Sequence, residues 1–184
     1  NIYESGNAKI SFQGHLRETT LRLVSSWFIY GENNKSSLTA GGLNIFINST
    51  MSVSIIIFNI TAQGNSGTNG NLALYLIDYA KGSGSSIVIN HSRIVDGRGE
   101  KGGGMRFWSH TGQSLGVSFT LGTHPILRII DSIFHNNSVS ETGGALYIAF
   151  YNNGTSQSYD GILRRVIIKN CSFTENGGDG AAWR

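Results

Sequence analysis

The chain has 184 residues, a formal net charge of +3 and only 14% charged residues. Its Lys and Arg residues form no basic run with interleaved aromatic residues, so nucleic acid is not an expected partner. No apolar run approaches the roughly 20 residues that a membrane helix needs, so we expect a soluble chain with no transmembrane segment. One domain of this length can bury a continuous core.

The N-terminal stretch, residues 1–20, is polar apart from one alternating patch at Ala8, Ile10 and Phe12. We interpret it as an N-terminal cap or partial coil, and the patch as a candidate strand for assembly with another copy. The chain begins at Asn1 without a signal peptide, which predicts a processed chain or a fragment.

From residue 21 onward, a unit of short strands recurs at intervals of 32 to 40 residues. Aliphatic residues stand seven and five positions before the centre of each unit, and a period of two predicts strands with one buried face. The unit centres are Phe28, Ile60, Ile94, Phe134 and Phe173. The residues five positions earlier are Leu23, Ile55, Ile89, Ile129 and Ile168, and those seven earlier are Leu21, Val53, Ile87, Leu127 and Val166.

Corner-forming residues follow each centre, where the chain has to turn. Three positions after the centres stand Gly31, Gln63, Gly97, Asn137 and Asn176. Farther along, a further strand begins after Gly41-Gly42, Gly70-Asn71, Gly103-Gly104, Gly143-Gly144 and Gly180-Ala181. These landmarks predict an all-β fold, a single-domain right-handed parallel β-helix of about five coils over residues 21–184. A β-propeller is the main alternative, but the hairpin turns that it requires are mostly missing.

Two motifs in the last units carry a family resemblance. Phe134-His-Asn-Asn137 is followed by Gly143-Gly144-Ala145-Leu146, and Phe173-Thr-Glu-Asn176 by Gly180-Ala181-Ala182. These resemble the Phe-x-x-Asn and Gly-Gly-Ala-Ile repeats of surface β-helices of the polymorphic-outer-membrane-protein type. The resemblance covers residues 21–184, with Gly or Gln in place of the Asn in the first three units. It implies surface display, adhesion or an extracellular scaffold, and it transfers no catalytic residue.

Acceptor motifs for N-glycosylation are the strongest chemical signal. The sequence holds seven of them, whereas its Asn, Ser and Thr content predicts about three by chance. They begin at Asn34, Asn48, Asn59, Asn90, Asn136, Asn153 and Asn170. We expect a secreted or cell-surface glycoprotein, with Asn170 the least occupied because it falls at a corner and is expected to point inward beside Asp131. A compositional origin of the excess stays open.

An enzymatic alternative rests on two carboxylates, Asp96 and Glu175, each placed two residues after a unit centre. Two coils apart, they would be separated by about 10 Å, near the upper limit of an inverting carboxylate pair. Many polysaccharide-cleaving enzymes are β-helices, but the paired-Asp motif of polygalacturonases is absent. A solvated row of corner residues is the simpler interpretation, and no cofactor or metal site is predicted.

The preferred hypothesis is therefore a secreted, glycosylated structural or adhesive domain that is not an enzyme. A polysaccharide hydrolase or lyase is the runner-up, and a cell-surface recognition module that binds through its long loops is a third possibility. The expected partners are neighbouring repeats of a longer chain, or other copies joined end to end into a filament or surface layer. The residues expected at such a contact are Ala8, Ile10, Phe12, Ala181 and Trp183.

Overall fold

The computed structural model describes residues 3–4, 7–14, 19–33, 40–49, 53–78, 85–111, 126–152 and 166–178. In these ranges all regular secondary structure is β-strand, arranged in four sheets, which we call A to D. Sheet A contains β1 (Tyr3–Glu4), β2 (Asn7–Gly14), β6 (Leu43–Ser49), β10 (Leu72–Asp78), β14 (Met105–Thr111) and β18 (Leu146–Asn152). Sheet B contains β3 (Thr19–Val24), β7 (Val53–Phe58), β11 (Ser86–Asn90), β15 (Ile126–Ile130) and β19 (Val166–Lys169).

The other two sheets are made of shorter strands. Sheet C contains β4 (Trp27–Ile29), β8 (Thr61–Gln63), β12 (Arg93–Val95), β16 (Ile133–His135) and β20 (Ser172–Thr174). Sheet D contains β5 (Glu32–Asn33), β9 (Ser66–Gly67), β13 (Arg98–Lys101) and β17 (Ser138–Thr142). All strand pairs in the four sheets are parallel except β1 with β2. A complete unit therefore contributes one strand to each of the four sheets.

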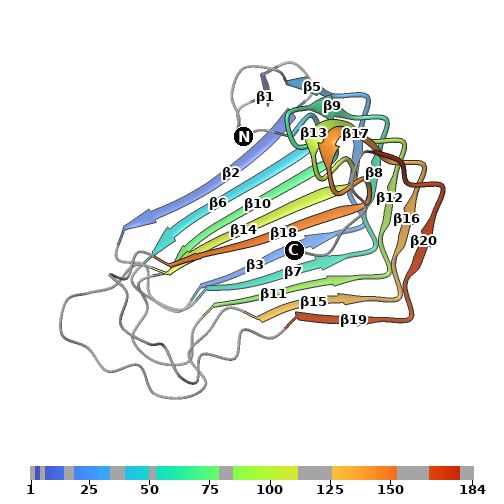
Figure 1. The fold of residues 1–184 in the computed structure, drawn as a ribbon. Helices are drawn as coiled ribbons and strands as arrows, with labels where there is room; N and C mark the ends of the chain where they lie inside the picture. The colour runs from blue at the N-terminus through green and yellow to red at the C-terminus, as the bar shows by residue number, and fades with distance from the viewer. Residues whose placement is uncertain are drawn as a thin grey trace.

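Neighbouring strands in sheets B, C and D, and from β2 onward in sheet A, are four apart in chain order. The chain therefore passes through sheets B, C, D and A in turn, and each pass stacks on the one before it. Figure 1 shows the result, with the colours advancing through each sheet in chain order. This arrangement is consistent with a β-solenoid. We call β3 to β6 coil 1, β7 to β10 coil 2, β11 to β14 coil 3 and β15 to β18 coil 4, and β19 begins coil 5.

The core lies between the sheets and is made of rows of equivalent residues from successive coils. Burial alternates along the strands, as in β7 and β11, because successive side chains point to opposite faces. One central row is paired in the order Leu23, Ile57, Ile89, Ile129 and Ile168. Ile57, Ile89 and Ile129 are fully buried. The aliphatic alternation of the sequence is therefore the inward face of sheet B.

The predicted register of coil 2 is wrong by two residues. Phe28 pairs with Ala62, and Ala62 with Ile94, so Ala62 is the centre of this unit in place of Ile60. A shift of two residues returns every side chain to the same face of a strand, so the hydrophobic pattern could not exclude it. Along with the centre, the coil-2 members of the buried rows and of the corner row move by two positions. Val53 is replaced by Ile55, Ile55 by Ile57 and Gln63 by Asn65.

The strand start predicted in coil 4 is wrong by one residue. Met105 pairs with Leu146, so the pair equivalent to Gly103-Gly104 is Gly144-Ala145. The extra residue is absorbed where β13 pairs with β17, because the register shifts between Gly99 and Lys101. Such a β-bulge adds one residue to one strand without ending the pairing.

A ladder of four asparagines runs inside the corner between sheets C and D: Asn65, Asn71, Asn137 and Asn176. Asn137 shows the pattern. Its Oδ1 accepts a hydrogen bond from the backbone N–H of Gly97 at 3.0 Å, and its Nδ2 donates to the carbonyl of Ile94 at 2.9 Å. Asn65 and Asn176 repeat this pattern, each bonding to one backbone N–H and one carbonyl of the preceding coil. These amides thereby give buried backbone N–H groups at the corner a partner.

The ladder is continuous because each amide also bonds to the next. Asn65 Nδ2 donates to Asn71 Oδ1 at 2.7 Å, Asn71 Nδ2 to Asn137 Oδ1 at 3.1 Å, and Asn137 Nδ2 to Asn176 Oδ1 at 2.9 Å. In coil 3 the ladder position is Gly97, where an added Cβ would clash with Asn71. Asn71, in the turn before β10, therefore occupies the place that a coil-3 asparagine would fill.

Candidate functional site

Two rows of corner residues with positive φ hold both candidate carboxylates and three of the acceptor asparagines. Positive φ is uncommon outside glycine and is best tolerated by Asn and Asp. The row between sheets B and C, which we call the first corner row, is Ser25, Asn59, His91, Asp131 and Asn170, with φ from 47° to 54°. The row between sheets C and D, the second corner row, is Tyr30, Gly64, Asp96, Asn136 and Glu175, with φ from 50° to 63°.

The two candidate catalytic carboxylates lie in the second corner row but are not brought together. Both oxygens of Asp96 accept hydrogen bonds, one from Asn136 Nδ2 at 2.8 Å and one from Gln63 Nε2 at 3.1 Å. Glu175 lies on the other side of Asn136, with one oxygen 3.8 Å from His135 Nε2 and its side chain 74% exposed. The intervening Asn136 amide occupies the space that a carboxylate pair would use for a water molecule or a sugar.

In the first corner row, Asn170 lies beside Asp131 as the sequence suggested, but it points outward. Asn170 Nδ2 donates to Asp131 Oδ1 at 3.1 Å, and the residue is exposed. His91 Nε2 approaches the other oxygen of Asp131 at 3.9 Å. The coil-2 member of this row is Asn59, and its Nδ2 donates to Ser25 Oγ at 3.2 Å. The predicted inward orientation of Asn170 is thus wrong. The reason to expect low glycan occupancy at Asn170 therefore no longer holds.

The acceptor asparagines divide by position. Asn59, Asn136 and Asn170 are exposed, Asn48 and Asn90 are half-buried, and Asn34 and Asn153 lie outside the described residues. Asn59, Asn136 and Asn170 all have positive φ. A structural demand for Asn at these corners therefore accounts for three of the acceptor motifs without any glycan.

Glycopeptide mapping should find sugar on the exposed acceptors Asn59 and Asn136 of protein taken from its natural source. Both side chains lie on the outer surface at a corner, where a glycan displaces only solvent. We expect equal or lower occupancy at Asn48, which is half-buried. Sugar on Asn48 with none on Asn59 or Asn136 would contradict this order of accessibility.

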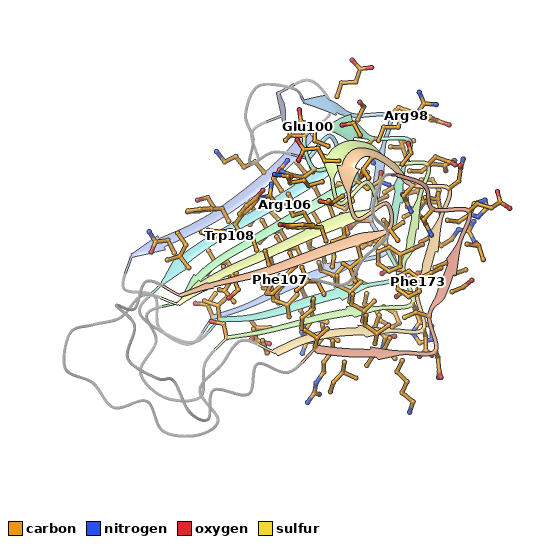
Figure 2. The ribbon with its side chains drawn as sticks, in the orientation of Figure 1. Arg98, Glu100, Arg106, Phe107, Trp108 and Phe173 are labelled. Carbon is orange, nitrogen blue, oxygen red and sulfur yellow. The ribbon has the colours of Figure 1, made fainter. Side chains whose placement is uncertain are left out.

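A cluster of aromatic residues and arginine, which was not among the residues predicted from the sequence, lies on the outer face of sheet A. Figure 2 labels Arg106 and Trp108 on the strand that carries the core residue Phe107 between them. Arg106 is only 9% exposed, and its Nη1 donates to Asn69 Oδ1 at 2.7 Å. Its guanidinium carbon lies 5.8 Å from the centroid of the Tyr75 ring and 5.4 Å from that of Tyr147.

The buried hydroxyl of Tyr75 lies within this cluster. Burial raises the pKa of Tyr75 to about 12, although Arg106 and a hydrogen bond from Asn69 Nδ2 act in the opposite direction. The ring also contacts Trp108, with 5.9 Å between centroids. Tyr75 is therefore neutral at physiological pH, and the cluster carries the single positive charge of Arg106. The sequence signal that could have indicated this cluster is the alternation of apolar residues with polar and aromatic residues in the strands that begin at Leu72, Met105 and Leu146. The signal becomes visible only when these three strands are aligned with one another.

Cys171 is half-buried in a row with Ser26, Ser92 and Ser132. Its Sγ donates to the carbonyl oxygen of Lys169 at 3.3 Å, just as Ser132 Oγ donates to that of Ile130 at 2.8 Å. The thiol thus takes the place of a corner serine. The coil-2 member of this row is Ile60.

The expected assembly residues are only partly described. Ala8, Ile10 and Phe12 of β2 pair with Leu43, Ile45 and Ile47 of the same chain. Ala181 and Trp183 lie outside the described residues. Within the described ranges there is no group of three or more His, Cys, Asp or Glu arranged to hold a metal ion, and no helix that could span a membrane.

Comparison with protein-family models, curated proteins and solved structures finds no match for this chain.

Proposed function

We propose that the chain is a structural or adhesive domain of an extracellular surface, secreted and N-glycosylated. The observation that carries the proposal is the way in which its polar corner residues are used. Asp96, Asp131 and Asn137 each accept a hydrogen bond from an equivalent or neighbouring residue of another coil. Polar side chains that tie one coil to the next serve the length and rigidity of the stack.

We take the stack to be a right-handed parallel β-helix related to the surface repeats that its motifs resemble. Right-handed crossovers between parallel strands are the rule. The corrected register supports the resemblance, since Ala62-Gln-Gly-Asn65 now aligns with Phe134-His-Asn-Asn137. Three of the five units thus carry Asn at the ladder position, and the remaining two carry Gly31 and Gly97.

The compartment and the adhesive role require separate measurements. Intact mass of the natural protein, before and after an asparagine-specific glycosidase, should fall by whole glycans if the chain has passed through a secretory pathway. Fluorescently labelled domain should then bind the surface of the source cells or their matrix in a saturable manner. A chain that carries no glycan, or shows no saturable binding and no self-association, would refute the proposal.

A recognition module is the second candidate, and the Arg106 cluster is the observation that favours it. Trp108 and Tyr147 are partly exposed on the outer face of sheet A, beside a guanidinium. Aromatic faces and arginine together are common at protein and carbohydrate contacts. If this cluster makes the contact, Trp108→Ala should abolish the saturable binding, whereas Trp27→Ala, in sheet C, should leave it unchanged.

A double substitution tests the enzymatic alternative. Replacing Asp96 with Asn and Glu175 with Gln should change the free energy of unfolding by about 1 kcal/mol or less, because Glu175 is exposed and the half-buried Asp96 is replaced by a side chain of the same shape. We expect any effect on polysaccharide-cleaving activity to be nil. A measurable activity in the natural chain that disappears in this double variant would establish the enzyme and end the structural proposal.

A further inference from the structure

The outer face of sheet B is largely apolar in the middle coils. Successive side chains of a strand point to opposite faces, so every second residue faces outward. In coils 2 to 4 the outward residues in the second halves of these strands are Ile56, Phe58, Val88, Asn90, Arg128 and Ile130. Phe58 is 39% exposed, and the three aliphatic members are half-buried. Parallel sheets in folded proteins usually have both faces covered, so a partly exposed apolar face of this kind favours a group that covers it.

Asn90 lies in the middle of this face and is one of the predicted glycan acceptors. In its row it pairs with Phe58 on one side and with Ile130 on the other, at the roughly 4.8 Å spacing of adjacent strands. Val88 precedes it on the same face of β11. A group attached to Asn90 therefore starts between apolar side chains that belong to three successive coils.

The carboxamide nitrogen of Asn90 is available for such an attachment. Its Oδ1 lies 2.7 Å from Nδ1 of His91, and its Nδ2 makes no hydrogen bond to any residue that the structure describes. At the acceptors Asn59, Asn136 and Asn170, by contrast, Nδ2 donates to a neighbouring side chain. Glycosylation replaces one proton of Nδ2 with the anomeric carbon of a sugar, and the diphosphate of the activated glycan donor leaves with the electron pair. At Asn90 this exchange disturbs no side-chain contact of Nδ2.

An aromatic pair stands beside this acceptor. The rings of Phe58 and His91 have centroids 5.4 Å apart and planes inclined by 47°. Phe58 keeps its exposed fraction in spite of this contact, so part of the ring is open on the outer face. The C–H groups on one face of a pyranose ring are weakly positive and pack against the negative face of an aromatic ring. The first sugar at Asn90 is thus next to a surface of the kind that sugars pack against.

We propose that an N-linked glycan on Asn90 packs along the outer face of sheet B, with its first N-acetylglucosamine unit against Phe58 and Ile130. The glycan is then a structural part of the stack, because it covers the apolar face and adds contacts between coils 2, 3 and 4. Beside Ile130 on β15, the exposed guanidinium of Arg128 supplies hydrogen-bond donors for sugar hydroxyls. This inference deepens the proposed function and rests on its N-glycosylation.

Thermal unfolding measures the contribution of this glycan as a difference of differences. The full chain and Asn90→Gln are each produced in a secretory eukaryotic host and in a bacterial host that adds no N-glycan. We expect the glycosylated parent to melt about 2 to 4 °C above glycosylated Asn90→Gln, and the two bacterial proteins to melt at the same temperature. Asn136→Gln is the matched control, because its glycan lies at an exposed corner and displaces only solvent. After subtraction of the bacterial pair, that glycan should contribute no shift.

The place of the sugar is tested by NMR of the glycosylated chain. Protons of the first sugar at Asn90 should show upfield ring-current shifts and nuclear Overhauser contacts to the Phe58 ring. Phe58→Leu keeps an apolar side chain but removes the ring, so it should abolish these shifts and reduce the thermal stabilisation by the glycan. Trp27→Ala, which removes an exposed ring from sheet C, should leave both unchanged. A cooperative thermal transition shows that each variant is folded.

Two outcomes would overturn the inference. The first is a chain from the secretory host that carries sugar at Asn59 or Asn136 but none at Asn90. The second is a glycan on Asn90 that gives neither stabilisation nor ring-current shifts, which would mean that it extends into solvent and leaves the face to a partner protein or a second copy. Neither outcome touches the glycan mass from other acceptors or the saturable binding, so the proposed function can stand when this inference fails. A natural chain with no sugar at any acceptor would refute both.

Discussion

Ile89→Ala should lower the free energy of unfolding by roughly 2 to 5 kcal/mol, the usual cost of removing a large aliphatic side chain from a packed core. Ile89 is fully buried in the central coil and is flanked in its row by Ile57 and Ile129. The smaller side chain leaves a cavity, and the strands around it cannot close the cavity without breaking their hydrogen bonds. Urea unfolding of both proteins, with the slopes compared, measures the loss.

Val88→Ala is the matched control for this variant, because Val88 is the preceding residue of the same strand. It faces outward and is half-buried. The loss there should be below about 1 kcal/mol, since less apolar area is removed from a packed environment. Equal losses at the two positions, or a loss below about 0.5 kcal/mol for Ile89→Ala, would mean that sheet B does not bury the face that the register assigns.

Asn137→Ala should destabilise the chain by roughly 1 to 3 kcal/mol, because it leaves one buried backbone group without its side-chain partner. This group is the Gly97 N–H, whereas the Ile94 carbonyl, in a strand that is paired on both sides, loses only the bond from the Asn137 amide. The substitution also interrupts the ladder between Asn71 and Asn176. Thermal and urea unfolding should both show the change, and hydrogen exchange at Gly97 should accelerate.

The exposed Asn170 provides the comparison for the ladder residue. Asn170→Ala removes one surface hydrogen bond to Asp131 and a residue suited to positive φ, so a cost of about 1 kcal/mol is expected. An Asn137→Ala variant no less stable than Asn170→Ala would show that the buried amide is not required. Asn137→Asp should not rescue stability, because a carboxylate cannot donate to Ile94 and would bury a charge.

The face of each strand was predictable from the chain alone. The alternation Leu127, Ile129 and its counterparts predicted parallel strands with buried rows, and the rows of coils 3, 4 and 5 pair as expected. Side chains of period two and glycine or asparagine corners are local properties of the chain, so local reasoning recovers them. The recurrence of the unit along the sequence also predicted that successive coils stack on one another.

The register of coil 2 and the opening of coil 4 were decided by tertiary contacts. Ile60 and Ala62 are both buried on inward positions, so hydrophobicity cannot rank them as the unit centre. Asn65 decides the matter in three dimensions, because only that register lets its amide reach the N–H of Gly31 at 2.7 Å and join the ladder. The bulge near Gly99 likewise depends on the partner strand.

At the polar sites too, the sequence predicted which residues share a row, and only the tertiary structure shows which of them are in contact. The sequence placed Asp96, Asn136 and Glu175 in one row, but only the structure shows Asn136 bonded to Asp96 and separating it from Glu175. The Arg106 cluster collects residues from β10, β14 and β18 and the turn before β10, which no local pattern links. Repetition in the sequence determines which side chains share a row, whereas the stacking distance and the turns of the coil determine which of them touch.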